Sequence, residues 1–128
     1  TAFVQKLKFP VYKMIIEHTD KILGEKHYKA ARERFGDKFS VEMSSWRTLE
    51  VCPKGSGKGE ALKRLISLLG KKFDKIVCVG DNQNDIGMFR LADTGYAVGN
   101  AIPALKRVAT RVTVNSRDGA IAKIIEEL

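Results

Sequence analysis

The sequence predicts an α/β fold with a change of pattern partway along the chain. Beyond about residue 60, short apolar runs alternate with amphipathic stretches, which is typical of βαβ units in a doubly wound parallel sheet. The earlier part has period-two runs bounded by turn residues, which indicates antiparallel strands. A glycine-rich stretch at residues 53–59 separates the two patterns. We therefore expect two structural units of different sheet type.

The first unit is expected to combine one helix with an antiparallel sheet. Pro10 suits the start of a strand, and Thr19 and Asp20 supply an N-cap for a helix. The turn at Ser44 and Ser45 separates two runs of period two, which predicts a hairpin. The expected elements are a strand at 9–16, a helix at 21–35 and strands at 39–43 and 46–51.

The second unit is expected to alternate helices and strands. Its first helix, residues 60–69, has an apolar face and ends at Gly70; the face comprises Leu62, Leu65, Ile66 and Leu69. Residues 76–79 form a continuously apolar run, as in the middle of a parallel sheet. The remaining elements are expected as a helix at 85–92, a strand at 96–98, a helix at 102–109, a strand at 112–114 and a last helix from 118.

Composition narrows the function classes. The net charge of +8 over 128 residues is scattered, without the clustered cations and interleaved aromatic residues of nucleic-acid binding. We therefore expect no nucleic-acid partner. No apolar run is long enough to cross a bilayer, so no membrane role is expected. Cys52 and Cys78 have no neighbours at zinc-ligand spacing, and a reduced, cytoplasmic protein is expected.

An acidic loop, Gly80-Asp81-Asn82-Gln83-Asn84-Asp85, follows the apolar run at 76–79. Ligands bind at the carboxyl ends of strands in open α/β sheets. Asp81 and Asp85 offer hard oxygen ligands that suit Mg²⁺, and the Asn84 amide can donate to a phosphoryl oxygen. The alternative is a solvated turn whose Asp and Asn side chains only cap the next helix. The preceding buried strand favours a metal and phosphate site.

Lys58 is the second candidate for this chemistry. We expect it in a loop just before a helix, where its cation can meet a carboxylate and a phosphate together. The surrounding glycines do not form a phosphate-binding P-loop, because Cys52 replaces the first Gly and Gly59 replaces the final Ser or Thr. A dinucleotide-binding glycine motif fails as well, because Leu62 stands at the third glycine.

These motifs together resemble the haloacid dehalogenase superfamily. The resemblance rests on Lys58-Gly59, on Val79-Gly80-Asp81 with Asn84-Asp85, on residues 97–101 (Ala-Val-Gly-Asn-Ala) and on Asp118-Gly119. Within the superfamily, the chain is most similar to Cof-type sugar-phosphate, phosphoglycolate and sucrose-phosphate phosphatases. The resemblance implies the C-terminal part of a Rossmann-like core at residues 49–128. Residues 1–48 resemble part of an α/β cap domain.

The resemblance also implies roles for the site residues. Lys58 would steady a nucleophile and the phosphoryl group, Asp81 would bind Mg²⁺, Asn84 would contact substrate phosphate, and Asp85 would support the metal shell as a catalytic and metal-binding residue. The reaction expected is hydrolysis of a small phosphorylated metabolite, such as a sugar phosphate, through an aspartyl-phosphate. Asn100 is expected either to shape the neighbouring loop or to be a turn-forming residue.

One part of the family pattern is missing. The nucleophilic Asp-x-Asp after an apolar strand has no match, because Asp20, Asp37 and Asp74 lack that context. We therefore expect the chain to be the C-terminal portion of a longer enzyme, inactive alone, and to associate with itself or with the missing portion. A non-catalytic module that binds Mg²⁺ or phosphate is the alternative function. His18 and His27 are expected to be polar surface residues.

Overall fold

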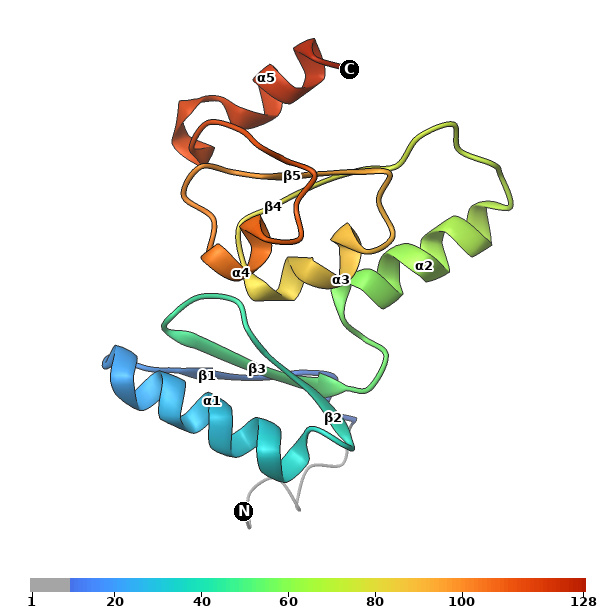
Figure 1. Cartoon of the computed structure of the whole chain (residues 1–128). Coiled ribbons are helices and arrows are strands. Elements are labelled where there is room, and N and C mark those ends of the chain that lie inside the picture. Colours follow the sequence, from blue (N-terminus) through green and yellow to red (C-terminus); the bar gives the residue numbers. More distant parts are fainter. Residues whose placement is uncertain (1–9) are drawn as a thin grey trace.

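The computed structural model describes residues 10–128, which form two units, each with its own sheet (Figure 1). The first unit contains β1 (Met14–Glu17), α1 (Lys21–Phe35), β2 (Phe39–Met43) and β3 (Thr48–Pro53). The second unit begins with α2 (Lys58–Leu69) and contains a parallel sheet. The predicted α/β fold class with a parallel sheet is confirmed.

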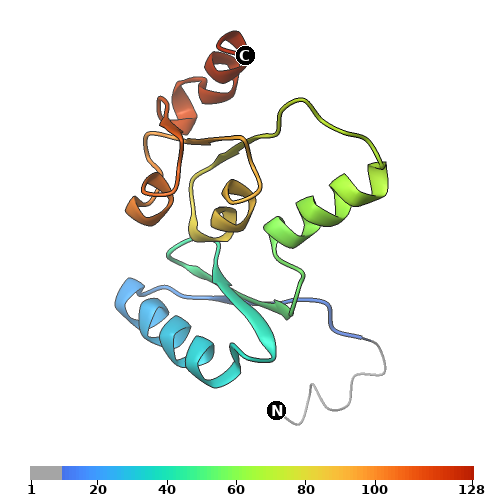
Figure 2. The same cartoon turned by 45° about the vertical axis from the view of Figure 1, so that its right-hand side comes forward.

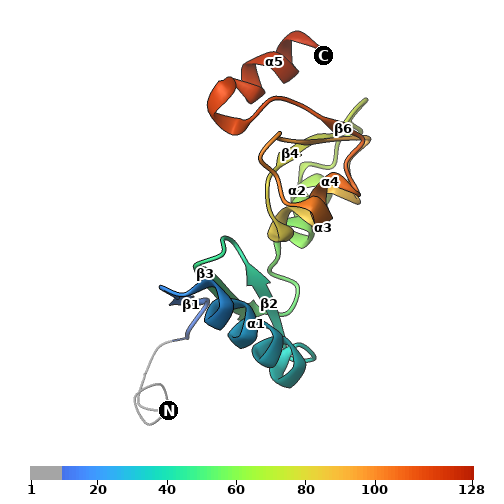
Figure 3. The ribbon, with the colours of Figure 1, turned by 60° about the vertical axis from the view of Figure 1, so that its left-hand side comes forward.

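The first sheet is antiparallel, with strand order β1-β3-β2. Asp20 caps α1 as predicted, because its carboxylate accepts a hydrogen bond of 2.8 Å from the Leu23 N–H. One face of the sheet packs against α1 through a small apolar core of Val41, Met43, Leu49, Val51, Tyr28 and Ala31. Figures 1 and 3 show α1 lying along one face of this sheet.

The second sheet is parallel, in the order β4-β5-β6. Its elements are β4 (Val77–Gly80), η2 (Gln83–Asp85), α3 (Ile86–Phe89), β5 (Thr94–Ala97), α4 (Pro103–Lys106), β6 (Arg111–Val112), η3 (Ser116–Asp118) and α5 (Ala120–Glu126). The buried core comprises Cys78, Phe89, Ala97, Val98, Ala101, Leu105 and Ala120. Gly95 permits this packing, because a Cβ there would lie 2.6 Å from Cδ1 of Phe89.

Several boundaries differ from the predictions. The strand predicted at 9–16 is found at Met14–Glu17, and Phe9 lies outside the described residues. The helix predicted over 85–92 is a short 3₁₀ turn, η2, followed by the four residues of α3. The helix predicted from residue 60 begins at Lys58, so the prediction that Lys58 lies in a loop is wrong. Gly57 has no side chain to cap this helix, so the sequence carries no start signal there.

The division of the chain between residues 48 and 49 stays a prediction. Strand β3 runs through Pro53 and pairs with both other strands of the first sheet. We therefore propose that the division lies in the connection at residues 54–57, where Gly55 has a positive φ of 75°. Figure 2 shows this connection as the one passage of the chain between the two units.

The apolar face of α2 is largely uncovered. Leu62 packs against the core, but Leu65 and Leu69 are about half exposed. Figure 2 shows α2 projecting sideways from the parallel sheet.

Within residues 10–128, no helix is long and apolar enough to span a membrane. Both cysteines are free thiols.

Candidate functional site

Asp85 is the centre of the acidic loop. It is buried, with only 2% of its surface exposed. Its Oδ2 accepts hydrogen bonds from the N–H groups of Asp81 and Asn82, at 3.0 and 3.1 Å. This fold-back requires Gly80, because a Cβ at that position would lie 2.7 Å from Oδ2 of Asp85. The loop is therefore closed on itself by one buried carboxylate.

Lys58 reaches the same carboxylate from the first turn of α2. Its Nζ lies 2.5 Å from Oδ1 of Asp85, although the two residues are 27 positions apart in sequence. A close contact of α2 with α3 makes this possible. A Cβ on Gly59 would lie 2.6 Å from the carbonyl carbon of Gly87, so the two helices approach at a pair of glycines.

The ion pair determines the charge state of Asp85. Burial acts to raise the pKa of its carboxyl, but hydrogen bonds from Lys58, Asp81 and Asn82 act in the opposite direction and prevail. The pKa therefore lies below its ordinary value, and Asp85 is ionised at neutral pH. The Lys58 side chain is 51% exposed, so its ammonium group is accessible to a ligand as well as to Asp85.

The other predicted site residues lie on two sides of the loop. Asn84 is half-buried and lines two cavities together with Lys58, of about 310 and 90 Å³. Asp81 is exposed and lines a different cavity of about 580 Å³, next to Asn82 and Asn100. The structure thus brings Lys58, Asn84 and Asp85 together, while Asp81 lies at the other side of the same loop.

The carboxylates of the acidic loop are the candidate ligands for Mg²⁺. This ion usually takes one or two protein carboxylates, keeps several waters and favours hard oxygen donors. Asp81 presents an exposed carboxylate at the end of β4, which suits such an ion. Both oxygens of Asp85 already accept hydrogen bonds from the chain itself. No cluster of three or more His, Cys, Asp or Glu side chains at metal-binding distance occurs within residues 10–128.

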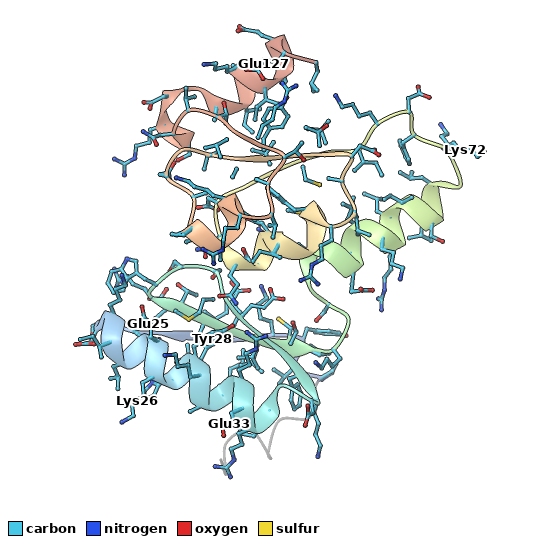
Figure 4. The ribbon with its side chains drawn as sticks, viewed as in Figure 1. Glu25, Lys26, Tyr28, Glu33, Lys72 and Glu127 are labelled. Atoms are coloured by element: carbon cyan, nitrogen blue, oxygen red, sulfur yellow. The ribbon has the colours of Figure 1, made fainter. Side chains whose placement is uncertain are left out.

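Two residues of the loop have contacts that were not predicted. The Asn82 side chain donates a hydrogen bond of 2.8 Å to the carbonyl of Ser44, and Gln83 donates one of 2.8 Å to the Tyr28 hydroxyl. Tyr28 projects from α1 in the first unit (Figure 4). The loop is therefore also a contact point between the units. The spacing of Asn82 and Asp85, which form a capping box, is the sequence signal that indicates a folded turn here.

Asn100 and the two histidines lie outside the acidic loop. Both alternatives expected for Asn100 are found, because it lies in a turn and its Oδ1 accepts a hydrogen bond of 2.8 Å from the Ser116 N–H of the neighbouring loop. The prediction that His18 is a surface residue is wrong. Only 6% of its surface is exposed, and its Nε2 lies 2.9 Å from Nδ1 of His27. His27 itself is exposed, as predicted.

Comparison with known proteins shows relatives of this chain. The family model described as haloacid dehalogenase-like hydrolase matches residues 2–125. The chain is 35% identical over 91 residues to the 5-amino-6-(5-phospho-D-ribitylamino)uracil phosphatase YwtE of Bacillus subtilis, a match covering 71% of this chain and 32% of that protein. It is 38% identical over 78 residues to phosphoglycolate phosphatase 2 of Saccharolobus solfataricus, a match covering 61% of this chain and 33% of that protein.

A solved structure has the same arrangement. A haloacid dehalogenase-like hydrolase from Bacteroides thetaiotaomicron superposes with a TM-score of 0.72 at 28% identity, covering 98% of this chain and 47% of that one. The chain therefore spans about a third of the length of the two curated relatives and about half of the solved structure. Because the family model matches almost the whole sequence, the chain belongs to the haloacid dehalogenase-like hydrolases.

Proposed function

We propose that this chain supplies the phosphate- and Mg²⁺-binding part of a phosphomonoesterase. The observation that carries the proposal is the ion pair of the half-exposed Lys58 with the buried Asp85 beside Asn84, at the carboxyl end of a parallel strand. Phosphoryl transfer depends mainly on positioning and on neutralising charge, and this loop offers both. The phosphatases among the relatives support the same reaction class.

In the proposed mechanism, each loop residue has its own task. Asp85 is ionised and holds the Lys58 ammonium in place, so that Lys58 can neutralise charge on the transferring phosphoryl group. Asn84 donates an amide hydrogen to a phosphoryl oxygen without adding negative charge. Asp81 would hold Mg²⁺, and the ion would supply positive charge to the phosphate oxygens. We place Asp85 behind Asp81 as support for the loop, because both of its oxygens are already engaged.

The attacking carboxylate is proposed to come from outside this chain. Asp20 caps α1, while Asp37 and Asp74 are exposed outside the helices and strands, and none of the three directly follows an apolar strand. The substrate is proposed to be a small phosphorylated metabolite, with no nucleic-acid or membrane partner. The cytoplasm remains the predicted compartment.

The test compares phosphate release by this chain and by the complete gene product, with Mg²⁺ and 4-nitrophenyl phosphate. We expect the complete protein to be active, this chain to be inactive, and Asp81→Asn to lower kcat/KM of the complete protein about 100-fold or more. Asp74→Asn is the matched control, because it removes one exposed carboxylate from another loop.

Two outcomes would contradict parts of this proposal. Turnover by this chain alone, abolished by Asp81→Asn, would show that the nucleophile is present after all. Absence of turnover by the complete protein would contradict the proposed phosphatase activity. Retained binding of Mg²⁺ and phosphate in that case would support the alternative, a non-catalytic binding module.

A further inference from the structure

The first sheet has a face that no helix covers and that points toward the acidic loop at residues 80–85, called the phosphate loop below. Val41 and Leu49 point to the α1 side, so their neighbours in each strand point to the other side. Glu42 pairs with Glu50 across the sheet, and Ser40 pairs with Cys52. We call this set of four side chains the open face.

The open face and the phosphate loop line the same cavities. The cavity of about 90 Å³ is bounded on one side by the open face and on the other by Lys58 and Asn84. This volume corresponds to about three water molecules, so it fits a small group beside a phosphate. Glu42 and Ser40 also line the neighbouring cavities of about 310 and 400 Å³. A leaving group attached to a phosphate at Lys58 would therefore enter a space that Glu42 helps to line.

The charges of the small cavity single out Glu42. Two cations, Lys13 and Lys58, line the small cavity, and each has an ion-pair partner. Lys13 Nζ lies 2.7 Å from Oε2 of Glu50, and Lys58 Nζ lies 2.5 Å from Oδ1 of Asp85. The hydrogen bond from Lys13 is the main reason why the pKa of Glu50 lies below its ordinary value. Glu42 accepts a hydrogen bond of 3.1 Å from the Ser40 hydroxyl but has no ion-pair partner among residues 10–128.

We infer that Glu42 is a specificity residue that accepts a hydrogen bond from a hydroxyl near the phosphoester, and so selects phosphorylated polyhydroxy alcohols over phosphorylated carboxylic acids. The inference rests on the proposed phosphatase function. A hydroxyl can donate to the unpaired carboxylate, whereas a substrate carboxylate would be repelled by it. Glu42 acts on the choice of leaving group and does not touch the reacting atoms.

The test uses three esters of similar size: n-propyl phosphate, glycerol 3-phosphate and 2-phosphoglycolate. For the complete gene product we expect kcat/KM for glycerol 3-phosphate to exceed the other two about 10- to 100-fold, the range of a hydrogen bond to a charged group. In Glu42→Ala, the ratio of glycerol 3-phosphate to n-propyl phosphate should fall toward one. In Glu42→Gln, the ratio of 2-phosphoglycolate to n-propyl phosphate should rise. Glu33→Gln, an exposed α1 residue in Figure 4, should leave both ratios unchanged.

Failure of this inference is distinguishable from failure of the phosphatase proposal. Hydrolysis of all three esters with equal efficiency, or an equal loss for all three in Glu42→Ala, would overturn the role of Glu42 alone. If no ester is hydrolysed, calorimetric binding of glycerol 3-phosphate and 2-phosphoglycolate decides. A preference for glycerol 3-phosphate that disappears in Glu42→Ala supports the inference, and the absence of any preference overturns it.

Discussion

At the scale of single residues, Asp85 shows how much depends on one buried carboxylate. It closes its own loop through two backbone N–H groups and orients Lys58 from another helix. A buried acceptor with three donors cannot be replaced without leaving polar groups unpaired, which costs about 1–3 kcal/mol. The loop and the lysine are therefore coupled, and neither is expected to keep its place without Asp85.

The lowered pKa of Asp85 makes stability depend on pH. The ordinary pKa of its carboxyl is 3.8, and the value in the folded protein is lower. Its contribution is therefore complete above about pH 5 and is lost as the pH falls through 3.8 and then through the lower folded value. Urea unfolding between pH 2.5 and 7 should show this loss in the wild type and a flatter profile in Asp85→Asn.

The exposed residue Asp37 supplies the control for that experiment. Asp37→Asn removes the same charge without a buried ion pair, so its profile should follow the wild type. Identical profiles for the wild type and Asp85→Asn would mean that the Lys58 pair does not contribute to stability.

His18 and Lys58 show which residue properties the sequence does not predict. An isolated histidine has no periodic pattern, and His18 is buried through non-local neighbours. Its backbone N–H donates to the Arg47 carbonyl at 2.7 Å, and a Cβ on Gly24 would lie 3.4 Å from its ring. The pairing of Lys58 with Asp85 is likewise invisible locally, because it depends on how two helices meet. The turn within residues 80–85 was predictable as a unit, because the bonds that close it on Asp85 and Asn82 are local, whereas its contacts with Ser44, Tyr28 and Lys58 were not.

At the scale of elements, the contact of α2 with α3 places Lys58. Gly59→Ala would put a methyl group 2.6 Å from the Gly87 carbonyl carbon, so the helices must separate. We expect a loss of about 1–3 kcal/mol in the free energy of unfolding, typical of overpacking. The higher helix propensity of Ala offsets about 1 kcal/mol of it at most. Chemical denaturation measures the change.

A second substitution in α2 separates crowding from helix propensity. Ser67→Ala lies at an exposed position of the same helix and should change stability by about 0.5 kcal/mol or less. If Gly59→Ala proved as stable as Ser67→Ala, the close contact with Gly87 would not determine the position of α2.

The sequence periodicity predicted whether a segment is a helix or a strand, but it did not predict where most of these elements begin and end. The helix at Lys21–Phe35 was predicted from its Asp N-cap with its end near Phe35, and the Phe39–Met43 strand was predicted from its alternation. In the second unit the helices after α2 and the last strand were predicted too long, while the strand predicted at 96–98 was too short, because β5 is Thr94–Ala97. Residues 112–114 read as a strand, but β6 is Arg111–Val112, because only Tyr96 and Ala97 of β5 pair with it. Pairing of this kind depends on neighbours distant in sequence.

At the scale of the whole molecule, uncovered apolar surface predicts association. Leu68 is 85% exposed on α2, and Leu65 and Leu69 are about half exposed. Strand β4 pairs only with β5 among the described strands, so its other edge carries free backbone groups. Burying apolar area gains about 25 cal/mol per Å². We expect this chain to self-associate, and Leu65→Lys with Leu69→Lys to shift it toward monomer in light scattering.

The control for association carries the same charge change at the opposite end of the unit. Ile125→Lys with Leu128→Lys also replaces two exposed apolar residues, in and after α5. If both double variants dissociate equally, added net charge is the cause rather than the α2 face. A monodisperse monomer of the wild type would contradict the prediction of self-association altogether.

The contacts of Asn82 and Gln83 with the first unit limit how hybrid proteins can be made from two members of the family. The loop that faces the phosphate is also the place where the first unit touches the second, through Ser44 and the Tyr28 hydroxyl. A hybrid protein that takes its first unit from another family member must therefore supply a matching carbonyl and hydroxyl at these two points. The two units have separate sheets, yet these two hydrogen bonds tie the first unit to the loop of the second.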